Sequence, residues 1–432
     1  MNFTPLRDRV GDPLYRNSFF LMGNTAITTG LGFIFWMVVA RYYNEYEVGV
    51  SAAIISAVTF LSLIGGLGLE TALIRFLPSS KTPSKLINSC LIMTGVASLI
   101  VSVIFVAGVN VFSPETAFIR DNPVFILVFI VFTVIWALSG IFDALFIARR
   151  RAEFNLIKNT VFSLVKIPLP IALATSFHAF GIVSSWCVAT GVGIGTALAL
   201  FLTRVQNTVR LKPEIDLRTV TGIWRYSAGN YLAGLLRAAP TLVLPIVIVN
   251  TLGGHQNAYF YVAWMIAGLL QAIPIAVSQS LFAEGSHFED RLAYNAWRSF
   301  KFAALLLVPG ILVIVFAGKW LLLIFGEGYA SNAQTLLVVL ATSSVFGAIN
   351  NIYFTILRVR GRIRELVVLR AAIALITLVT IGLIVTPGSG IVVIGYVWIG
   401  TQALISAYIL LAVRLRLRGA GHPGARGGRE PR

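Results

Sequence analysis

Long apolar stretches recur along the whole chain and are separated by short polar connections. A transmembrane helix needs about 20 mostly apolar residues, and twelve runs reach that length. They cover residues 18–40, 48–68, 87–112, 124–147, 160–179, 181–203, 228–250, 257–282, 302–325, 334–356, 365–386 and 390–413. The fifth and sixth runs are nearly continuous around a tight hinge, and the ninth is interrupted at Gly318, Lys319 and Trp320. The pattern predicts an all-α integral membrane protein of about twelve spans, and eleven or thirteen spans are the alternative counts.

Composition supports this prediction and excludes two other classes. Hydrophobic residues make up 57% of the 432 residues and charged residues 12%, whereas a soluble domain carries about 25% charged residues. The chain is too hydrophobic to be disordered. The 34 Lys and Arg residues outnumber the 17 Asp and Glu residues, for a net charge of +17. Such an excess indicates either a nucleic-acid surface or the enrichment of basic residues in cytoplasmic loops.

The positions of the basic residues decide between these explanations. Twenty-eight of the 34 lie in the N-terminal segment, the C-terminal tail and every second connection, including Lys158 after the fourth span and Arg358 after the tenth. The alternate loops hold only Arg41, Arg120 and Lys319. This alternation predicts a multi-pass protein of the cell membrane with both termini in the cytoplasm. It leaves no concentrated basic domain for nucleic acid.

The span order divides the chain into two halves. The connection at 204–227 separates a six-helix lobe at 18–203 from a second at 228–413. Both lobes enter the membrane from the same side, so a repeat would be parallel, although internal identity is weak. We expect a central cleft between the lobes, a cytoplasmic segment at 1–17, and a basic, Gly- and Pro-rich tail at 414–432 that is attracted to anionic lipids.

Signals for catalysis are missing from the sequence. The outer connections are about ten residues long, as at 113–123, which is too short to build an extracytoplasmic active site. No phosphate-binding loop motif, metal-ligand spacing or catalytic triad is present. Cys90 and Cys187 fall inside spans and indicate no disulfide framework. We therefore predict a protein that is not an enzyme and uses no cofactor or metal.

Ionisable residues inside spans are costly and mark functional sites by default. Asp143 and Lys166 lie at similar depth on consecutive antiparallel spans, so we expect them to form an ion pair. This pair would either stabilise the first lobe or line the cleft. In the cleft, it could release Lys166 to an anionic cargo or use a protonatable Asp143 for ion coupling.

Arg237 lies about twelve residues into the seventh span, near the membrane midplane. Apart from Glu365 at the first position of the eleventh run, no Asp or Glu occurs in the predicted spans of the second lobe. The arginine should therefore contact an anionic cargo or a watery cavity, or else bond to carbonyls freed by Pro240 and Pro245, which bend the helix. Arg370 is close enough to a span end to snorkel to the inner interface.

Several amides inside the spans are further candidates for lining the cleft. They could contact cargo, or they could bridge neighbouring helices, as such groups often do. They are Asn24, Gln271, Gln279, Asn350 and Asn351.

Four short motifs resemble the oligosaccharide flippases of the multidrug/oligosaccharidyl-lipid/polysaccharide exporter superfamily. The most extended is GGLGLETALIRFLP at residues 65–78, and the others are Asn24 with the Gly-Leu-Gly of 30–32, Glu47-Val48-Gly49, and the basic loop at 149–151. The similarity covers essentially the whole chain in span number, loop lengths and two-lobe layout.

The resemblance implies alternating access and transport of a polyprenyl-pyrophosphate-linked oligosaccharide to the outer leaflet. It implies a cationic central cavity that holds the pyrophosphate, with Arg237 as the matching candidate. Arg75 lies in the most extended motif near the inner end, where it would anchor lipid head groups or latch the inner gate. Implied partners are the lipid bilayer and the glycosyltransferases or polymerase of the same pathway, and the protein would act as a monomer.

Two alternatives stay open beside this interpretation. One is a multidrug or small-solute antiporter of the same fold. The absence of an acidic residue from the first span argues against this alternative, whereas Asp143, as a carboxylate inside a span, argues for it. The other is a membrane polysaccharide polymerase. The chain lacks the two additional C-terminal spans found in lipid II flippases.

Overall fold

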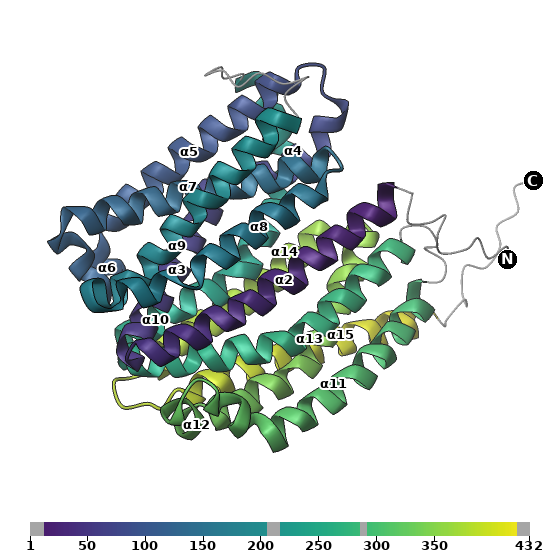
Figure 1. Ribbon diagram of the computed structural model, residues 1–432. Helices are drawn as coiled ribbons and strands as arrows, with labels where there is room; N and C mark the ends of the chain where they lie inside the picture. Colours follow the sequence, from purple (N-terminus) through teal and green to yellow (C-terminus); the bar gives the residue numbers. More distant parts are fainter. Residues whose placement is uncertain (1–12, 205–216, 286–291, 421–432) are drawn as a thin grey trace, which may run out of the picture.

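Helices account for every regular element in the described parts of the chain. The computed structural model describes residues 13–204, 217–285 and 292–420 (Figure 1). The elements of the first lobe are α2 (Pro13–Tyr42), α3 (Glu45–Gly65), α4 (Leu69–Phe76), η1 (Leu77–Ser79), α5 (Pro83–Ala107), α6 (Val109–Phe112), η2 (Pro114–Asp121), α7 (Pro123–Ala148), α8 (Ala152–Lys166) and α9 (Leu169–Arg204). Those of the second lobe are α10 (Leu217–Gly285), α11 (Leu292–Leu323), α12 (Glu327–Asn332), α13 (Gln334–Val359), α14 (Ile363–Ile384) and α15 (Val392–Ala420).

The span pattern confirms the predicted all-α membrane fold. Within the described ranges, eleven helices are long and apolar enough to cross a membrane. One of them, Ala228–Phe282 in α10, covers 55 residues and turns at Gly253, where φ is 85°. Counting the two halves of α10 separately gives twelve spans.

Some predicted boundaries are wrong. The ninth span is not interrupted at Gly318, because α11 continues to Leu323. The fifth span starts at Ala152 instead of residue 160. The predicted linker and tail are partly helical, since α10 begins at Leu217 and α15 extends to Ala420; residues 1–12, 205–216 and 421–432 lie outside the described part of the chain.

One contact between the lobes is far closer than ordinary helix packing. Where α3 begins, Gly49 lies directly against the start of the second half of α10. A methyl group on Gly49 would overlap the carbonyl oxygen of Gly254. The side-chain amide of Asn257 donates to the carbonyl oxygen of Gly49 at 2.7 Å, and the Tyr259 hydroxyl donates to Glu45. Glycine is required on α3 because no side chain fits between the two backbones.

Further polar contacts join the lobes at the same end of the molecule, which we call the loop end. Arg41, at the end of α2, donates to the carbonyl oxygens of Leu323 at 3.4 Å and Ile324 at 3.1 Å. The Asn250 side chain accepts from the backbone N–H of Glu115 at 3.1 Å. The loop end is therefore closed by contacts from several helices of each lobe.

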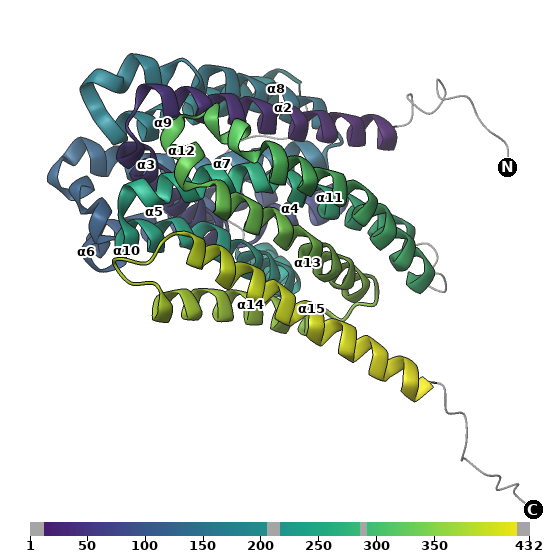
Figure 2. The ribbon, with the colours of Figure 1, turned by 90° about the horizontal axis from the view of Figure 1, so that it is seen from below.

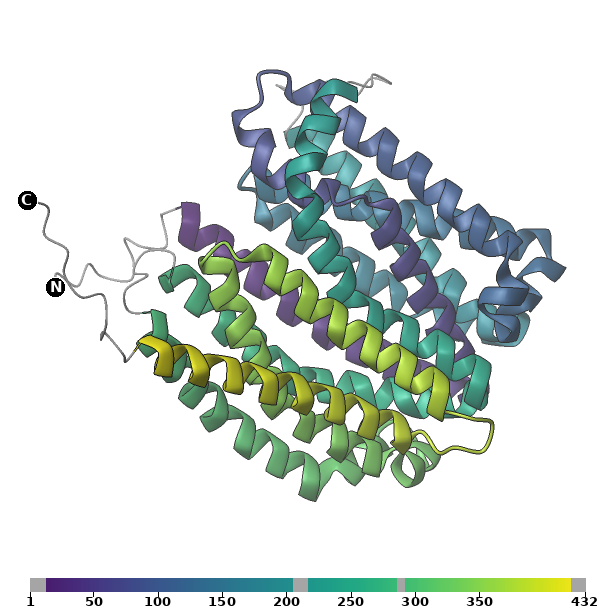
Figure 3. The ribbon, with the colours of Figure 1, turned by 180° about the vertical axis from the view of Figure 1, so that it is seen from behind.

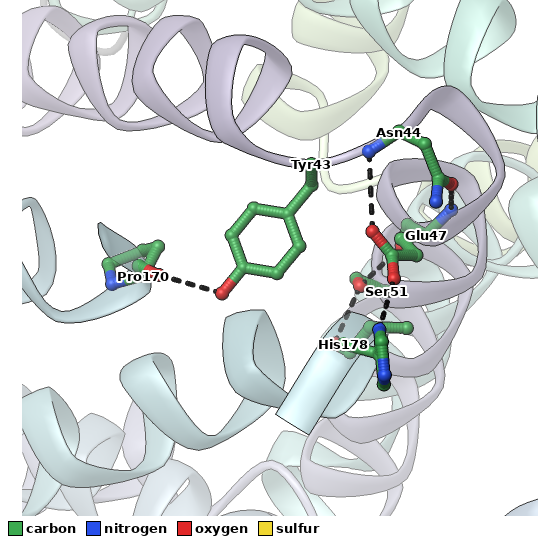
Figure 4. A network of polar contacts seen from close by, with 7 residues as sticks. Tyr43, Asn44, Glu47, Ser51, Pro170 and His178 are labelled. Atoms are coloured by element: carbon green, nitrogen blue, oxygen red, sulfur yellow. Dashed lines mark hydrogen bonds and ion pairs between the residues drawn. The ribbon is translucent and has the colours of Figure 1, made fainter. Parts of the chain in front are cut away.

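A polar network fixes the turn between α2 and α3 within the first lobe (Figure 4). Asn44 caps α3 and exchanges two hydrogen bonds with Glu47. Glu47 also contacts His178 at 2.9 Å, at the kink inside α9. The Tyr43 hydroxyl donates to the carbonyl oxygen of Pro170 at 2.8 Å. This network ties the first residues of α3 to α9, so the surface that faces α10 is rigidly supported.

The opposite end, where α2 begins and α15 ends, is more open. Helices α5 and α7 on one side separate there from α11, α13 and α15 on the other (Figures 1 and 3), and the view from below shows the end of α15 extending away from the bundle (Figure 2). The turn between α3 and α4, where Gly68 has φ of 72°, contacts α10 through Tyr231, whose hydroxyl donates to the carbonyl oxygen of Ile64 at 3.0 Å. Beyond this contact the lobes diverge, so they meet most closely at the loop end.

We predict that Gly49→Ala opens the loop end. The added methyl overlaps the α10 backbone, and such overpacking costs about 1–3 kcal/mol. Spin labels at Asp121 and Ser331, in a background with Cys90 and Cys187 replaced by Ala, should report a longer distance between the lobes than in the parent protein.

The matched control is Gly400→Ala, because a methyl group at Gly400 meets no atom within 4 Å. Its distance distribution should equal that of the parent. An unchanged distribution in Gly49→Ala would show that the two glycines do not hold the lobes together.

Candidate functional site

A cavity with a volume of about 970 Å³, which we call the first cavity, lies between the lobes. Its wall is formed by residues of α2, α3, α4, α7, α8, α9 and α10. Charged side chains on this wall are Glu70, Asp143, Lys158, Lys166 and Arg237. Eight aromatic side chains share the wall: Phe33, Trp36, Trp136, Phe162, Trp186, Tyr231, Tyr261 and Trp264.

Asp143 pairs with Lys158, so the predicted pair with Lys166 is wrong. The Lys158 ammonium lies 2.8 Å from Asp143 Oδ2 and donates to the Ser139 hydroxyl at 2.7 Å. Lys158 was assigned to a cytoplasmic loop, but α8 starts at Ala152 and carries it into the bundle, where its side chain is 1% exposed. A buried lysine requires a counter-ion, and the Asp143 carboxylate on α7 provides it.

Lys166 has aromatic neighbours in place of an acid. Its Nζ lies 4.7 Å from the ring centre of Phe35, 4.8 Å from that of Phe162 and 4.1 Å from that of Trp186. The residue is 3% exposed. An ammonium over aromatic faces is attracted by the negative charge density of the rings, which replaces the missing carboxylate.

Glu70 lines the first cavity, although it lies outside the predicted spans and was not among the predicted site residues. It lies two residues past the predicted end of the second span, but the Gly-rich turn before α4 brings it back against α7. A methyl group on Gly140 would overlap its carboxylate oxygen, and Asp143 follows one helical turn later. The signal available in the sequence was the motif GGLGLE, which places an acid directly after a break in a membrane helix.

The second cavity lies within the second lobe and has a volume of about 690 Å³. Its wall carries Arg237, Arg358 and Arg370, and none of the described residues lining it is acidic. Arg237 and Trp264 line both cavities. Arg237 therefore stands at the junction of a mixed-charge cavity and an entirely cationic one.

The two other arginines depart from their predicted places. Arg358 was assigned to a cytoplasmic loop, but it lines the cavity because α13 continues to Val359. Arg370 does not snorkel to the interface: it is 5% exposed, donates to the carbonyl oxygen of Ala233 at 2.8 Å and lies over the ring of Phe354. Its Nε has no hydrogen-bond partner among the described residues.

The amide candidates lie on the cavity walls, but most also bond to the protein. Asn24 accepts from the side-chain amide of Asn159 at 3.0 Å beside the first cavity. Asn350 donates to Gln402 at 2.7 Å, and Asn351 donates to a carbonyl of its own helix. Gln271 and Gln279 line the second cavity.

Arg75 lies apart from both cavities. It is exposed near the end of α4, with its guanidinium 5.9 Å from the ring centre of Phe76. Within the described ranges, no group of three His, Cys, Asp or Glu side chains could hold a metal ion.

Solved structures with the same architecture define the class of the fold. The lipid II flippase MurJ in an inward closed conformation gives a TM-score of 0.74 at 12% identity, over 92% of this chain and 87% of that one. An inward-facing multidrug resistance MATE family transporter of the MOP superfamily gives 0.70 at 15% identity, over 94% and 99%. An outward-facing MATE family transporter gives 0.64 at 16% identity, over 95% and 97%. The chain has the fold of a MOP-superfamily membrane transporter.

The sequence identifies a narrower family. The polysaccharide biosynthesis protein family matches residues 14–283, which is more than half of the chain. The chain belongs to this family, as its motifs indicated. No curated protein sequence gives a match.

We predict that the Asp143–Lys158 pair behaves as a unit. Asp143→Asn leaves a fully buried ammonium and should cost about 3–5 kcal/mol of unfolding free energy. Lys158→Met should cost less, because the Asp143 side chain is 32% exposed and can be hydrated from the cavity. The Asp143→Asn/Lys158→Met double variant should recover most of the loss.

Thermal unfolding in detergent, followed by tryptophan fluorescence, measures this cycle. Additive losses in the double variant would show that the two side chains do not stabilise each other.

Proposed function

We propose that this protein is a flippase that carries a polyprenyl-pyrophosphate-linked oligosaccharide across the cell membrane by alternating access. The observation that carries the proposal is the second cavity, which presents Arg237, Arg358 and Arg370 without an acidic residue among its described lining. An uncompensated cationic cavity inside a membrane bundle favours an anionic cargo.

The arginines match the chemistry of a pyrophosphate. Guanidinium groups bind phosphate oxygens through paired, charge-assisted hydrogen bonds. Arg370 holds one bond to the protein and keeps Nε unpartnered among the described residues. Arg358 and Arg370 lie within electrostatic reach of each other and of Arg237, so a bound anion would relieve their mutual repulsion.

The first cavity suits the oligosaccharide. It adjoins the arginine cavity through Arg237 and Trp264, and it combines amide, hydroxyl and carboxylate groups with flat aromatic faces. Such a wall offers hydrogen bonds to sugar hydroxyls and apolar contact to sugar rings. A single substrate would therefore place its pyrophosphate in one cavity and its sugars in the other.

The structure would represent the inward-facing state. The distribution of basic residues favours cytoplasmic termini, and with that orientation the closed loop end would face outward and the divergent end inward. The higher TM-score with the inward-facing MATE transporter, 0.70 against 0.64, supports this assignment. Pro240 and Pro245 interrupt the hydrogen-bond ladder of α10 beside Arg237 and would let this helix bend during the transition.

The remaining functional assignments follow from the same proposal. The protein would act as a monomer without catalysis or cofactor, and it would exchange substrate with glycosyltransferases or a polymerase of the pathway. Arg75 would hold lipid head groups at the inner end. Nucleic acid has no place in the mechanism.

One observation favours a second candidate, a small-solute antiporter of the same fold. The first cavity brings two carboxylates together, Glu70 and Asp143, and Lys158 is ion-paired with Asp143 alone. A pair of neighbouring carboxylates suits the binding of a proton or cation. Loss of the gene should then alter sensitivity to toxic compounds and leave lipid-linked sugars unchanged, whereas loss of a flippase should make the lipid-linked oligosaccharide accumulate in the inner leaflet.

We predict that Arg237→Ala weakens binding of a polyprenyl pyrophosphate to the purified protein at least about tenfold, since a charge-assisted hydrogen bond contributes about 1.5–3 kcal/mol. Arg358→Ala should act in the same direction. Fluorescence or calorimetric titration measures the change, and surface polysaccharide in cells that depend on the protein should fall in parallel.

Lys319→Ala is the matched control, because it removes one exposed positive charge outside both cavities. The uncharged polyprenol should bind equally to all variants. Unchanged pyrophosphate binding and polysaccharide display in Arg237→Ala would contradict the assigned cargo site.

A further inference from the structure

Lys166 fills an aromatic box on the wall of the first cavity. We define the box by Phe35 on α2, Phe162 on α8 and Trp186 on α9, whose ring centres lie 4.1–4.8 Å from the Lys166 ammonium. Phe35 and Trp186 pack edge to face at 5.8 Å, as do Phe162 and Trp186 at 5.8 Å. Three rings from three helices thus surround one cationic group.

The position of Lys166 is set by the backbone. Lys166 is the last residue of α8, and Pro168 and Pro170 follow it before α9 is established. Proline cannot continue the helical hydrogen bonds, and the Tyr43 hydroxyl anchors this segment through the carbonyl oxygen of Pro170. A lysine at the C-terminal end of a helix is also favoured by the helix dipole.

Among the described residues, Lys166 forms no ion pair with an acidic side chain. The three helices that face it contribute aromatic rings, and the Asp143 carboxylate on the same cavity wall is engaged by Lys158. An aromatic box of this kind is the arrangement by which proteins bind alkylammonium and quaternary ammonium ions. In this chain the box is occupied by a cation tethered to the protein itself.

We propose that Lys166 is a selectivity residue: it occupies a binding site for organic cations and thereby excludes such cations from the cavity. The lysine acts both by filling the box and by adding positive charge to a wall rich in Trp and Phe. The proposal goes beyond the flippase function and does not depend on which anion is carried.

Removing the lysine should expose the site. Truncation to alanine vacates the volume of three methylene groups and an ammonium, and the freed rings adjoin Trp36 and Trp136 on the same cavity wall. A planar aromatic cation could then stack in the opened box, and cation–π contacts with desolvated rings are among the strongest of their kind. The parent protein offers no such space.

Ethidium titration of the purified full-length protein, followed by fluorescence, tests the proposal. Lys166→Ala should bind ethidium about tenfold or more tightly than the parent protein. Lys166→Arg keeps both charge and bulk in the box and should bind no more tightly than the parent. In the Lys166→Ala/Trp186→Ala variant, the gained affinity should disappear, because the closest ring is removed.

A second measurement covers the case in which Lys166→Ala is poorly stable. The n-propylammonium ion reproduces the deleted part of the side chain, so it should raise the melting temperature of Lys166→Ala and leave that of the parent unchanged, while n-propanol should have no such effect. The proposal is overturned if Lys166→Ala gains neither ethidium affinity nor stabilisation by n-propylammonium. It is equally overturned if the gained affinity survives Trp186→Ala.

Discussion

The close approach of α3 and α10 at the loop end determines how the two lobes can be arranged. Gly49 and Gly254 bring two backbones into contact, and Asn257 donates across the contact to the carbonyl oxygen of Gly49. Buried backbone carbonyls need such a partner in a membrane bundle, because lipid offers none. The lobes approach most closely at this end, so the space between them widens toward the other, and the first cavity lies in that space.

Charge is distributed differently on the two sides of this space. In the first lobe, Lys158 is neutralised by Asp143, and Lys166 is enclosed by aromatic rings, so neither ammonium is offered to a ligand. In the second lobe, three arginines face a cavity without an acid among its described lining. The two lobes therefore differ in how they accommodate charged side chains: positive charge is compensated in the first lobe and uncompensated in the second.

The sequence was sufficient to predict the fold because lipid solvation imposes a simple rule. Apolar runs of membrane length and the alternation of basic loops gave the span count, and both arise from forces that act on each segment separately. The candidate site was harder to predict, since it depends on where each helix begins. A shift of eight residues in the start of α8 moved Lys158 from a loop into the bundle and gave it the carboxylate predicted for Lys166.

The same reasoning explains why the sequence identified Arg237 as a candidate site residue but did not identify Arg358 and Arg370. Arg237 lies in the middle of a long apolar run, so its place inside the membrane follows from sequence position alone, and in the structure its side chain is exposed on the cavity walls. Arg358 and Arg370 lie near predicted span ends, and a long side chain there has an alternative route to water. Only the three-dimensional arrangement shows that α13 and α14 direct both toward Arg237, and that Arg370 is bonded to the backbone of α10 at Ala233. A cluster of like charges assembled from separate helices has no sequence signature. Both its free-energy cost and its ability to bind an anion depend on tertiary contacts.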